Sequence, residues 1–179
     1  YISSTEVIIR AGCKPVFVDI DPNTMNICMK DLIKKINKRS AAIIAVSLFG
    51  QIADVEELKK IRKRFDIPII EDAAQSFGAQ YQTIKSCNIF DIGCTSFFPT
   101  KALGCFGDGG ALFTNDDAVA ERVRALRTHG GQGFDHQHIG TNARFDTIQA
   151  AVLIAKLPHF NDEILIRQQL AARYSEALG

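Results

Sequence analysis

Short apolar runs alternate with amphipathic stretches along the first half of the chain. Residues 15–19, 42–46 and 68–71 are apolar, rich in β-branched residues and bounded by polar turns. Runs of this kind are typical of strands that are buried on both faces of a parallel sheet. The three segments are therefore predicted to be parallel strands.

The stretch between the second and third runs has the period of a helix. Residues 54–65 place four apolar side chains on one helical face, namely Val55, Leu58, Ile61 and Phe65. Asp54 can cap this helix, and Glu56 and Lys60 form a favourable i,i+4 pair. The strand-to-strand spacing of roughly 25 residues suits a right-handed crossover through a helix. We therefore expect an α/β protein with a mostly parallel sheet.

Two further strands are expected, at residues 92–97 and 110–114, before the pattern becomes helical. Asn115 or Asp116 can cap the first of the later helices, and a polar loop follows over residues 131–142. Asp146 can cap the next helix. In the last helix three apolar residues recur at intervals of seven, so its apolar stripe needs another surface to cover it: Ile164, Ala171 and Leu178.

Composition and charge restrict the range of partners. Of the 179 residues 46% are hydrophobic and 23% are charged, and the net charge is +1 at pH 7. This balance is typical of a soluble globular protein, and it gives no electrostatic reason to expect a nucleic acid or a membrane as the main partner. The five cysteines lack metal-ligand spacing, so we expect reduced thiols in a cytoplasmic protein and no metal site.

The two ends of the chain suggest a longer protein. The chain opens at Tyr1 without a methionine and continues directly into an expected helix over residues 5–12. It stops at Gly179, at the end of a helical pattern. We therefore expect the chain to be a fragment that is incomplete at both ends.

Two segments carry residues suited to catalysis. Asp72 directly follows the run at 68–71, so it should lie at the carboxyl end of a parallel strand, where open α/β sheets place ligands. Lys101 follows an aromatic strand end and a Pro-Thr turn, with Ser96 five residues before it. An amine, an acid and a hydroxyl are what a pyridoxal phosphate enzyme needs for the cofactor's aldehyde, ring nitrogen and phosphate.

Each of these residues also has an ordinary structural interpretation. Asp72 could instead cap a helix over residues 73–77. Lys101 taken alone would be a solvated surface lysine, and Ser96 an ordinary strand residue. The combination of the three in this order favours the catalytic interpretation.

Taken together, the motifs resemble the DegT/DnrJ/EryC1/StrS family of sugar aminotransferases, which are fold-type I pyridoxal phosphate enzymes. The resemblance covers nearly the whole chain, and the order and spacing of its second and third motifs are highly specific. The motifs are Gly12-Cys-Lys-Pro-Val-Phe-Val-Asp-Ile-Asp21, Glu71-Asp-Ala-Ala-Gln-Ser76, Ser96-Phe-Phe-Pro-Thr-Lys101, Gly107-Asp-Gly-Gly110 and Asn142-Ala-Arg-Phe-Asp-Thr-Ile-Gln-Ala-Ala151.

The resemblance implies a three-layer αβα large domain of the aspartate aminotransferase type. Residues 1–158 would be part of the pyridoxal phosphate-binding large domain. Residues 159–179 would be a long helix that leads toward a small C-terminal domain beyond the chain. The segment that gives backbone amides to the cofactor phosphate would likewise precede residue 1.

The resemblance also implies roles for individual residues within one subunit. Lys101 would bond to the cofactor's aldehyde and move the proton between the substrate carbon and the cofactor. Asp72 would pair with the pyridine nitrogen, and Gln75 would contact the phenolic edge of the ring. Ser96 would bind the phosphate.

Other implied roles depend on the assembly or depart from the family. Asn142 and Arg144 would reach toward the cofactor phosphate of the neighbouring subunit, which implies a homodimer with shared active sites. Tyr1 falls where the family places an aromatic residue stacked on the cofactor ring. Many members carry His where this chain has Ser47, and the sequence alone does not explain that difference.

The implied reaction is the transfer of an amino group from glutamate to a keto carbon of a nucleotide-linked sugar. Residues 142–151 most resemble members that act on UDP-linked N-acetyl keto sugars for surface polysaccharide. One alternative is a sugar dehydratase of the same family, but dehydratases carry His at the position of Lys101. Another is a non-catalytic regulatory relative, against which Lys101 and Asp72 argue. A nicotinamide-binding domain ranks last, because no G-x-G-x-x-G follows any strand.

Overall fold

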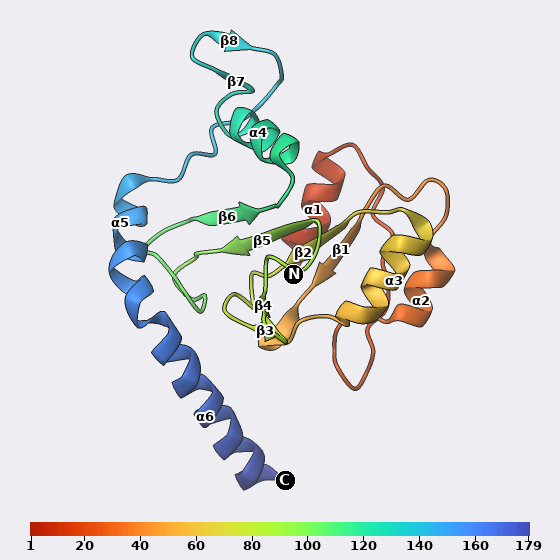
Figure 1. Cartoon of the computed structure of the whole chain (residues 1–179), viewed down its shortest axis with the longest axis vertical. Coiled ribbons are helices and arrows are strands. Elements are labelled where there is room, and N and C mark those ends of the chain that lie inside the picture. The colour runs from red at the N-terminus through yellow and green to blue at the C-terminus, as the bar shows by residue number, and fades with distance from the viewer.

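The computed structural model describes residues 1–179, with the side chain of residue 132 left out of the description. A four-stranded sheet in the order β1-β2-β5-β6 forms its centre (Figure 1). The three parallel strands are β1 (Ile43–Val46), β2 (Ile69–Asp72) and β5 (Ile92–Ser96), and β6 (Gly110–Phe113) pairs with β5 in the antiparallel direction. The predicted α/β fold with a mostly parallel sheet is confirmed.

Two helices, α2 (Met29–Lys35) and α3 (Val55–Phe65), lie side by side against β1 and β2 (Figure 1). The core between them consists of aliphatic side chains: Leu32, Ile43, Ala45, Ala53, Leu58, Ile61, Ile67 and Ile69. Asp54 caps α3 as expected, since its side chain accepts a hydrogen bond from the Glu57 amide. The expected pair between Glu56 and Lys60 is replaced by Lys60 with Glu57, at 2.6 Å.

A second core lies where the chain leaves β5. It joins Phe97, Leu103 and Cys105 to Leu153 of α5 (Thr147–Lys156) and to Phe160 at the start of α6 (Phe160–Leu178). A short 3-10 helix, η2 (Leu157–His159), connects the two helices. This core therefore packs the loop after β5 against the helical second half of the chain.

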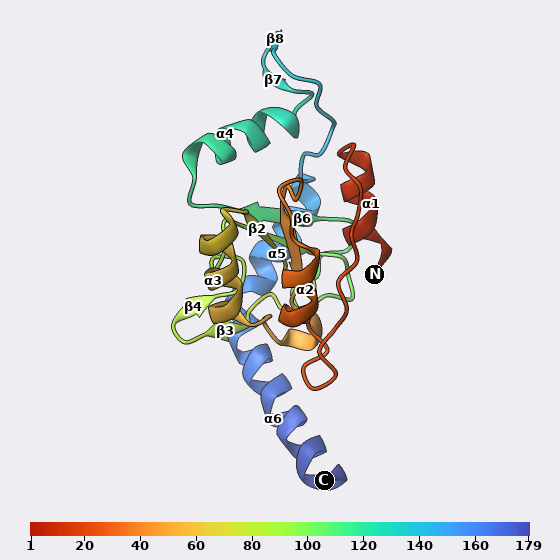
Figure 2. The same ribbon diagram turned by 90° about the vertical axis from the view of Figure 1, so that its right-hand side faces the viewer.

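The remaining elements lie around this centre. They are α1 (Ile2–Arg10), the 3-10 helix η1 (Leu48–Gly50), the hairpin of β3 (Gln80–Tyr81) and β4 (Ile84–Lys85), α4 (Asp117–Leu126), and the hairpin of β7 (Gly131–Gln132) and β8 (Asp135–His136). Asp116 caps α4, as expected. The β7–β8 hairpin and α6 project from opposite ends of the molecule (Figures 1 and 2).

Much of the apolar side of α6 is open to solvent. Its exposed large residues are Leu165, Ile166, Leu170, Tyr174 and Leu178. Among the described side chains, the stripe expected to need a covering surface is covered only through the contacts of Phe160 and Ile164. No helix in the described chain is both long and apolar enough to cross a membrane.

One predicted strand and one structural alternative are wrong. Residues 15–19 pair with no strand of the sheet. Two of their backbone groups bond to α2 instead: the Lys35 ammonium donates to the Phe17 carbonyl at 2.7 Å, and the Asp19 amide donates to Asp31 at 2.8 Å. The Asp19 amide and the Lys35 ammonium hold the pKa of Asp31 below its ordinary value. The alternative helix over residues 73–77 is also absent, and turns occupy that segment. The expected polar loop at 131–142 includes the β7–β8 hairpin.

Candidate active site

Asp72 is the last residue of β2, and its carboxylate is fixed by two contacts. Ser4 of α1 donates its hydroxyl to Oδ2 at 2.7 Å, and the Ala74 amide donates to Oδ1 at 3.1 Å. Because alternate side chains of a strand point to opposite faces, Asp72 points away from the face that carries Ile69 and the α2–α3 core. The predicted position at the carboxyl end of a parallel strand is therefore found.

Gln75 and Lys101 are brought together across the edge of the sheet. The Lys101 ammonium donates to Gln75 Oε1 at 3.3 Å. Gln75 lies on the turn after β2, and this turn is tied to β5 by the Thr95 hydroxyl, which donates to the Ala73 carbonyl at 3.2 Å. We call Asp72, Gln75 and Lys101 the lysine–acid cluster. Asp72 ends β2, Gln75 lies on the turn after it, and Lys101 lies on the loop after the adjacent strand β5.

The loop that carries Lys101 is held from α5. Lys156 donates its ammonium to the Gly104 carbonyl at 2.6 Å, and Gln149 Oε1 accepts from the Phe106 amide at 2.8 Å. The buried Cys105 thiol donates to the Phe97 carbonyl at 2.9 Å, which closes the loop on itself. Gly104 fits this turn because a Cβ there would meet the Pro99 carbonyl oxygen at 2.6 Å. Sequence reasoning missed Gln149 and Lys156, since both are ordinary polar residues on an amphipathic helix.

Ser96 ends β5, and its hydroxyl shapes the turn toward Lys101. The hydroxyl oxygen accepts from the Phe98 amide at 3.2 Å, and the Lys101 amide donates to the Phe98 carbonyl at 2.9 Å. The side chain is half-buried. Ser96 is thus placed beside the loop of the lysine–acid cluster.

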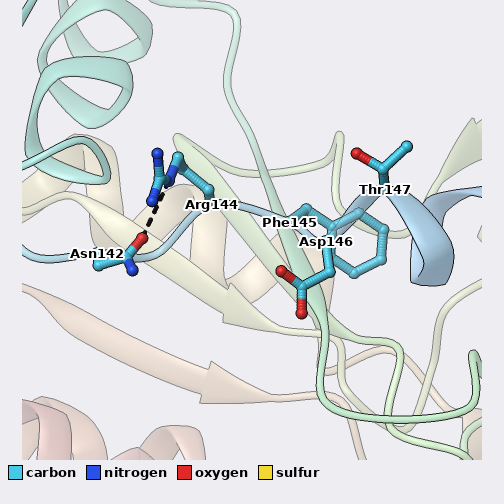
Figure 3. A pocket seen from close by; sticks show the side chains of 5 residues that line it. All are labelled: Asn142, Arg144, Phe145, Asp146 and Thr147. Atoms are coloured by element: carbon cyan, nitrogen blue, oxygen red, sulfur yellow. Dashed lines mark hydrogen bonds between the residues drawn. The ribbon is translucent and has the colours of Figure 1, made fainter.

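Asn142 and Arg144 lie on the segment that leads into α5. They line a shallow hollow together with Phe145, Asp146 and Thr147 (Figure 3). This stretch is referred to below as the 142–147 segment. Arg144 Nε donates to Asn142 Oδ1 at 3.1 Å, and both side chains are exposed. Among the described side chains, neither residue bonds to the lysine–acid cluster.

Tyr1 is also apart from the cluster. It precedes α1 and is fully exposed, with a relative accessibility of 103%. Sequence reasoning missed Ser4, which is three residues further along and is the residue of this region that contacts Asp72. Nothing in the local sequence marks Ser4, because the contact joins residues 68 positions apart.

Two thiols near the cluster are kept in their neutral form. Burial, followed by the negative charges of Asp72 and Glu71, raises the pKa of Cys94 to about 11. Burial, followed by the charge of Glu71, raises the pKa of Cys87 to about 12. A neutral thiol is a poor nucleophile, so neither thiol offers a thiolate beside Lys101.

A buried carboxylate that sequence reasoning did not single out lies next to Asp72. Glu71 is completely inaccessible to solvent. It accepts hydrogen bonds from the Ser47 hydroxyl, the Ser86 hydroxyl and the Cys87 amide, at 2.9, 2.9 and 2.7 Å. The local sequence gives one signal, which is the position of Glu71 on the same face of the strand as Ile69.

Comparison with known proteins places the whole chain in one family. Residues 1–179 match the profile of the DegT/DnrJ/EryC1/StrS aminotransferase family. The chain is 49% identical to the UDP-2-acetamido-2-deoxy-3-oxo-D-glucuronate aminotransferase of Pseudomonas aeruginosa, with 99% of the chain and 50% of that protein covered. The chain spans about half the length of the curated relatives it matches.

Solved structures show the same similarity. A DegT DnrJ EryC1 StrS aminotransferase from Brucella abortus is 43% identical with a TM-score of 0.95, and 99% of this chain and 50% of that chain are covered. S. venezuelae DesV in complex with a ketimine intermediate is 38% identical with a TM-score of 0.96, over 100% of this chain and 48% of that chain. The sheet and the helices described above are thus those of a fold that is already known from crystals.

Proposed function

Because this chain belongs to the DegT/DnrJ/EryC1/StrS aminotransferase family, we propose that it carries the lysine-bearing part of a pyridoxal phosphate-dependent aminotransferase active site that acts on a nucleotide-linked keto sugar. The observation that carries this proposal is the contact between Lys101 and Gln75 at 3.3 Å beside Asp72. The cluster lies at the carboxyl end of parallel strands, where open α/β sheets bind ligands. For Asp72, Gln75 and Lys101 we propose the same roles that the sequence resemblance implies.

The residues present fit pyridoxal phosphate. The cluster offers a primary amine for the aldehyde, a carboxylate for the ring nitrogen and an amide for the phenolic edge. Ser96 lies on the neighbouring strand end, where its hydroxyl would bind the phosphate. Both Asp72 carboxylate oxygens accept a hydrogen bond, so the orientation of this carboxylate is fixed.

These residues divide the chemistry among themselves. When bound, pyridoxal phosphate supplies an aldehyde that takes up the amino group and a ring that takes up electrons. Lys101 accepts and returns the proton at the substrate carbon, and Gln75 keeps the amine oriented toward that position. Asp72 supplies a fixed negative charge, and Ser4 prevents this carboxylate from turning away.

The relatives support a substrate class. The Pseudomonas aeruginosa relative acts, by its name, on a UDP-linked 2-acetamido 3-keto sugar. We infer a UDP-linked N-acetyl keto sugar for this chain, with glutamate as the amino donor and a cytoplasmic role in the synthesis of surface polysaccharide. The motif at residues 142–151 supports the same class.

A homodimer with shared sites accounts for the 142–147 segment. Asn142 and Arg144 are exposed and bond to each other within the chain, so a partner subunit is the surface they would serve. Tyr1 would stack on the cofactor ring. Residues 1–158 would be part of the large domain, and residues 159–179 would lead toward a small domain, with the exposed apolar side of α6 covered there.

The dehydratase alternative remains less favoured. Dehydratases of this family carry His where this chain has Lys101, and the amine at that position contacts Gln75 here. A regulatory role would not require Asp72 and Lys101 to be placed together on adjacent strand ends. Both observations favour an aminotransferase.

Borohydride reduction tests the proposal. The intact protein is incubated with pyridoxal phosphate, reduced and digested, and the labelled peptide is identified by mass spectrometry. We expect a phosphopyridoxyl group on Lys101 alone, and no such peptide from Lys101→Ala. Labelling spread over many lysines in the folded intact protein would contradict the aminotransferase assignment.

A further inference from the structure

Glu71 is a buried acid with no cationic partner. It is 0% exposed, and none of the ion pairs among the described side chains includes it. Burying a carboxylate is costly, and hydrogen bonds offset the cost without making the buried group a strong source of net stability. The three hydrogen bonds to Glu71 therefore indicate that it positions the segments that donate them.

The donors of Glu71 come from separate segments. Ser47 follows β1, while Ser86 and Cys87 follow β4. The Ser47 amide also donates to the Asp72 carbonyl at 3.0 Å. Glu71 therefore joins two loops to the end of β2, at the peptide unit that carries Asp72.

A chain of hydroxyl groups extends from Glu71 to the turn that carries Gln75. Ser86 has one hydroxyl hydrogen, which it donates to Glu71, so the Ser76 hydroxyl must be the donor in the 3.0 Å contact between Ser76 and Ser86. Ser76 is the residue after Gln75, and it is only 2% exposed. The hydrogen bonds from Ser76 to Ser86 and from Ser86 to Glu71 thus anchor the turn that carries Gln75.

We propose that Glu71 is a positioning residue that sets the lysine–acid cluster from the opposite face of β2. It holds the turn of Gln75 through Ser86 and Ser76, and it holds the Asp72 peptide through Ser47. This inference rests on the proposed function, because the geometry that it sets is that of the cofactor-binding residues. It also gives Ser47 a role, as a hydroxyl donor to a buried carboxylate.

Three variants of the intact protein test this role. Glu71→Leu keeps most of the volume and removes every acceptor. Glu71→Gln is the conservative variant, because its oxygen can still accept from the Cys87 amide while its amide group donates to serine hydroxyls that rotate to accept. Ser76→Ala removes only the last link, and Glu57→Gln, at an exposed carboxylate on α3, is the matched control.

Two measurements separate positioning from stability. In the cofactor-free protein, amide hydrogen exchange is followed over residues 73–79. In the pyridoxal phosphate-loaded protein, the pH midpoint of the visible absorption band and kcat/KM are measured. We expect Glu71→Leu to speed exchange in that turn, to move the midpoint and to lower kcat/KM about tenfold or more. Glu71→Gln should restore wild-type behaviour within about twofold, and Ser76→Ala should lie between them.

Folded Glu71→Leu protein with the wild-type pH midpoint and wild-type exchange over residues 73–79 would overturn the inference. If Glu71→Leu does not fold, Ser76→Ala decides in the same way. Failure of the wild type to take up pyridoxal phosphate at Lys101 would instead overturn the proposed function. The exchange measurement would still decide whether Glu71 holds the turn, since it needs no cofactor.

Discussion

The lysine–acid cluster and the 142–147 segment are built in opposite ways. Asp72 is held by Ser4 of α1 and by the Ala74 amide, and Lys101 reaches from the loop after β5 to Gln75 on the turn after β2, so the cluster's contacts join separate elements of the chain. Asn142 and Arg144 are exposed and bond to each other. Preorganised groups suit covalent and electrostatic chemistry, whereas exposed groups next to a shallow hollow suit a surface that receives something from outside.

The largest change in activity is expected when a variant of the lysine–acid cluster and a variant of the 142–147 segment are combined in one dimer. Lys101→Ala and Arg144→Ala are each expected to be nearly inactive in the intact protein. When the two are co-expressed, a mixed dimer with shared sites would hold one fully wild-type site, so about one quarter of the wild-type activity should return. Glutamate-dependent amination of a UDP-linked N-acetyl keto sugar is the assay.

The control combines two inactive variants that both affect the lysine–acid cluster. Lys101→Ala co-expressed with Asp72→Ala should give no recovery, because each site of the mixed dimer then lacks one residue of the cluster. No recovery with Arg144→Ala would show that the 142–147 segment serves its own subunit. Recovery in the Asp72→Ala control would instead show that Lys101 and Asp72 do not serve the same site from one chain.

The second prediction concerns the charge of Asp72. Asp72→Asn should lower kcat/KM about 10²–10³-fold, because it removes a negative charge aimed at the cofactor ring but keeps the shape. Ser4→Ala leaves the charge and removes one of its two fixed contacts, so its effect should be smaller. Wild-type kcat/KM in Asp72→Asn would mean that this carboxylate does not serve the ring.

The cluster could be predicted better than its support. Asp72 and Lys101 follow apolar runs, and a strand end is a local property of the sequence. Glu71 has the same sequence setting as Asp72, yet its partners Ser47 and Ser86 are 24 and 15 residues away. Local periodicity carries no information about such contacts, so the buried network could be found only in three dimensions.

The fold shows the same limit. The helix α3 and its Asp54 cap were predictable because every interaction involved lies within a few residues. Residues 15–19 have the same apolar character as the true strands, but they pair with none of them, and the Phe17 carbonyl and the Asp19 amide bond to Lys35 and Asp31 of α2. Strand propensity is a local property, whereas a place in the sheet depends on a neighbouring strand that the local sequence does not specify.

A smaller effect is expected where the two regions meet, at α5. Lys156→Met removes the ammonium that holds the Gly104 carbonyl and should cost about 1.5–3 kcal/mol of unfolding free energy. The Lys101 loop would loosen, and kcat/KM should fall about tenfold. Lys63→Met, at an exposed lysine of α3, is the control. Unchanged kcat/KM in Lys156→Met would show that α5 does not position the loop.

The smallest effect concerns the thiol beneath the cluster. Since the pKa of Cys94 is about 11, roughly one such thiol in a thousand is ionised at pH 8. Iodoacetamide at pH 8 should therefore modify the exposed Cys13 and leave Cys94 and Cys87 intact, as peptide mass spectrometry would show. Alkylation of Cys94 as fast as Cys13 would mean that the strand end is open to solvent.

The Cys94 thiol also predicts how the free energy of unfolding changes with pH. Its proton is bound more tightly in the folded chain than at the ordinary thiol pKa of 9.0. Its contribution to the free energy of unfolding is therefore complete below pH 9 and is lost as the pH rises toward about 11. Urea titrations at pH 8 and 10.5 should show the wild type losing more stability than Cys94→Ala. Equal losses of stability would mean that Cys94 is exposed to solvent. The lysine–acid cluster would then be as exposed as the 142–147 segment, and the contrast between the two regions would fail.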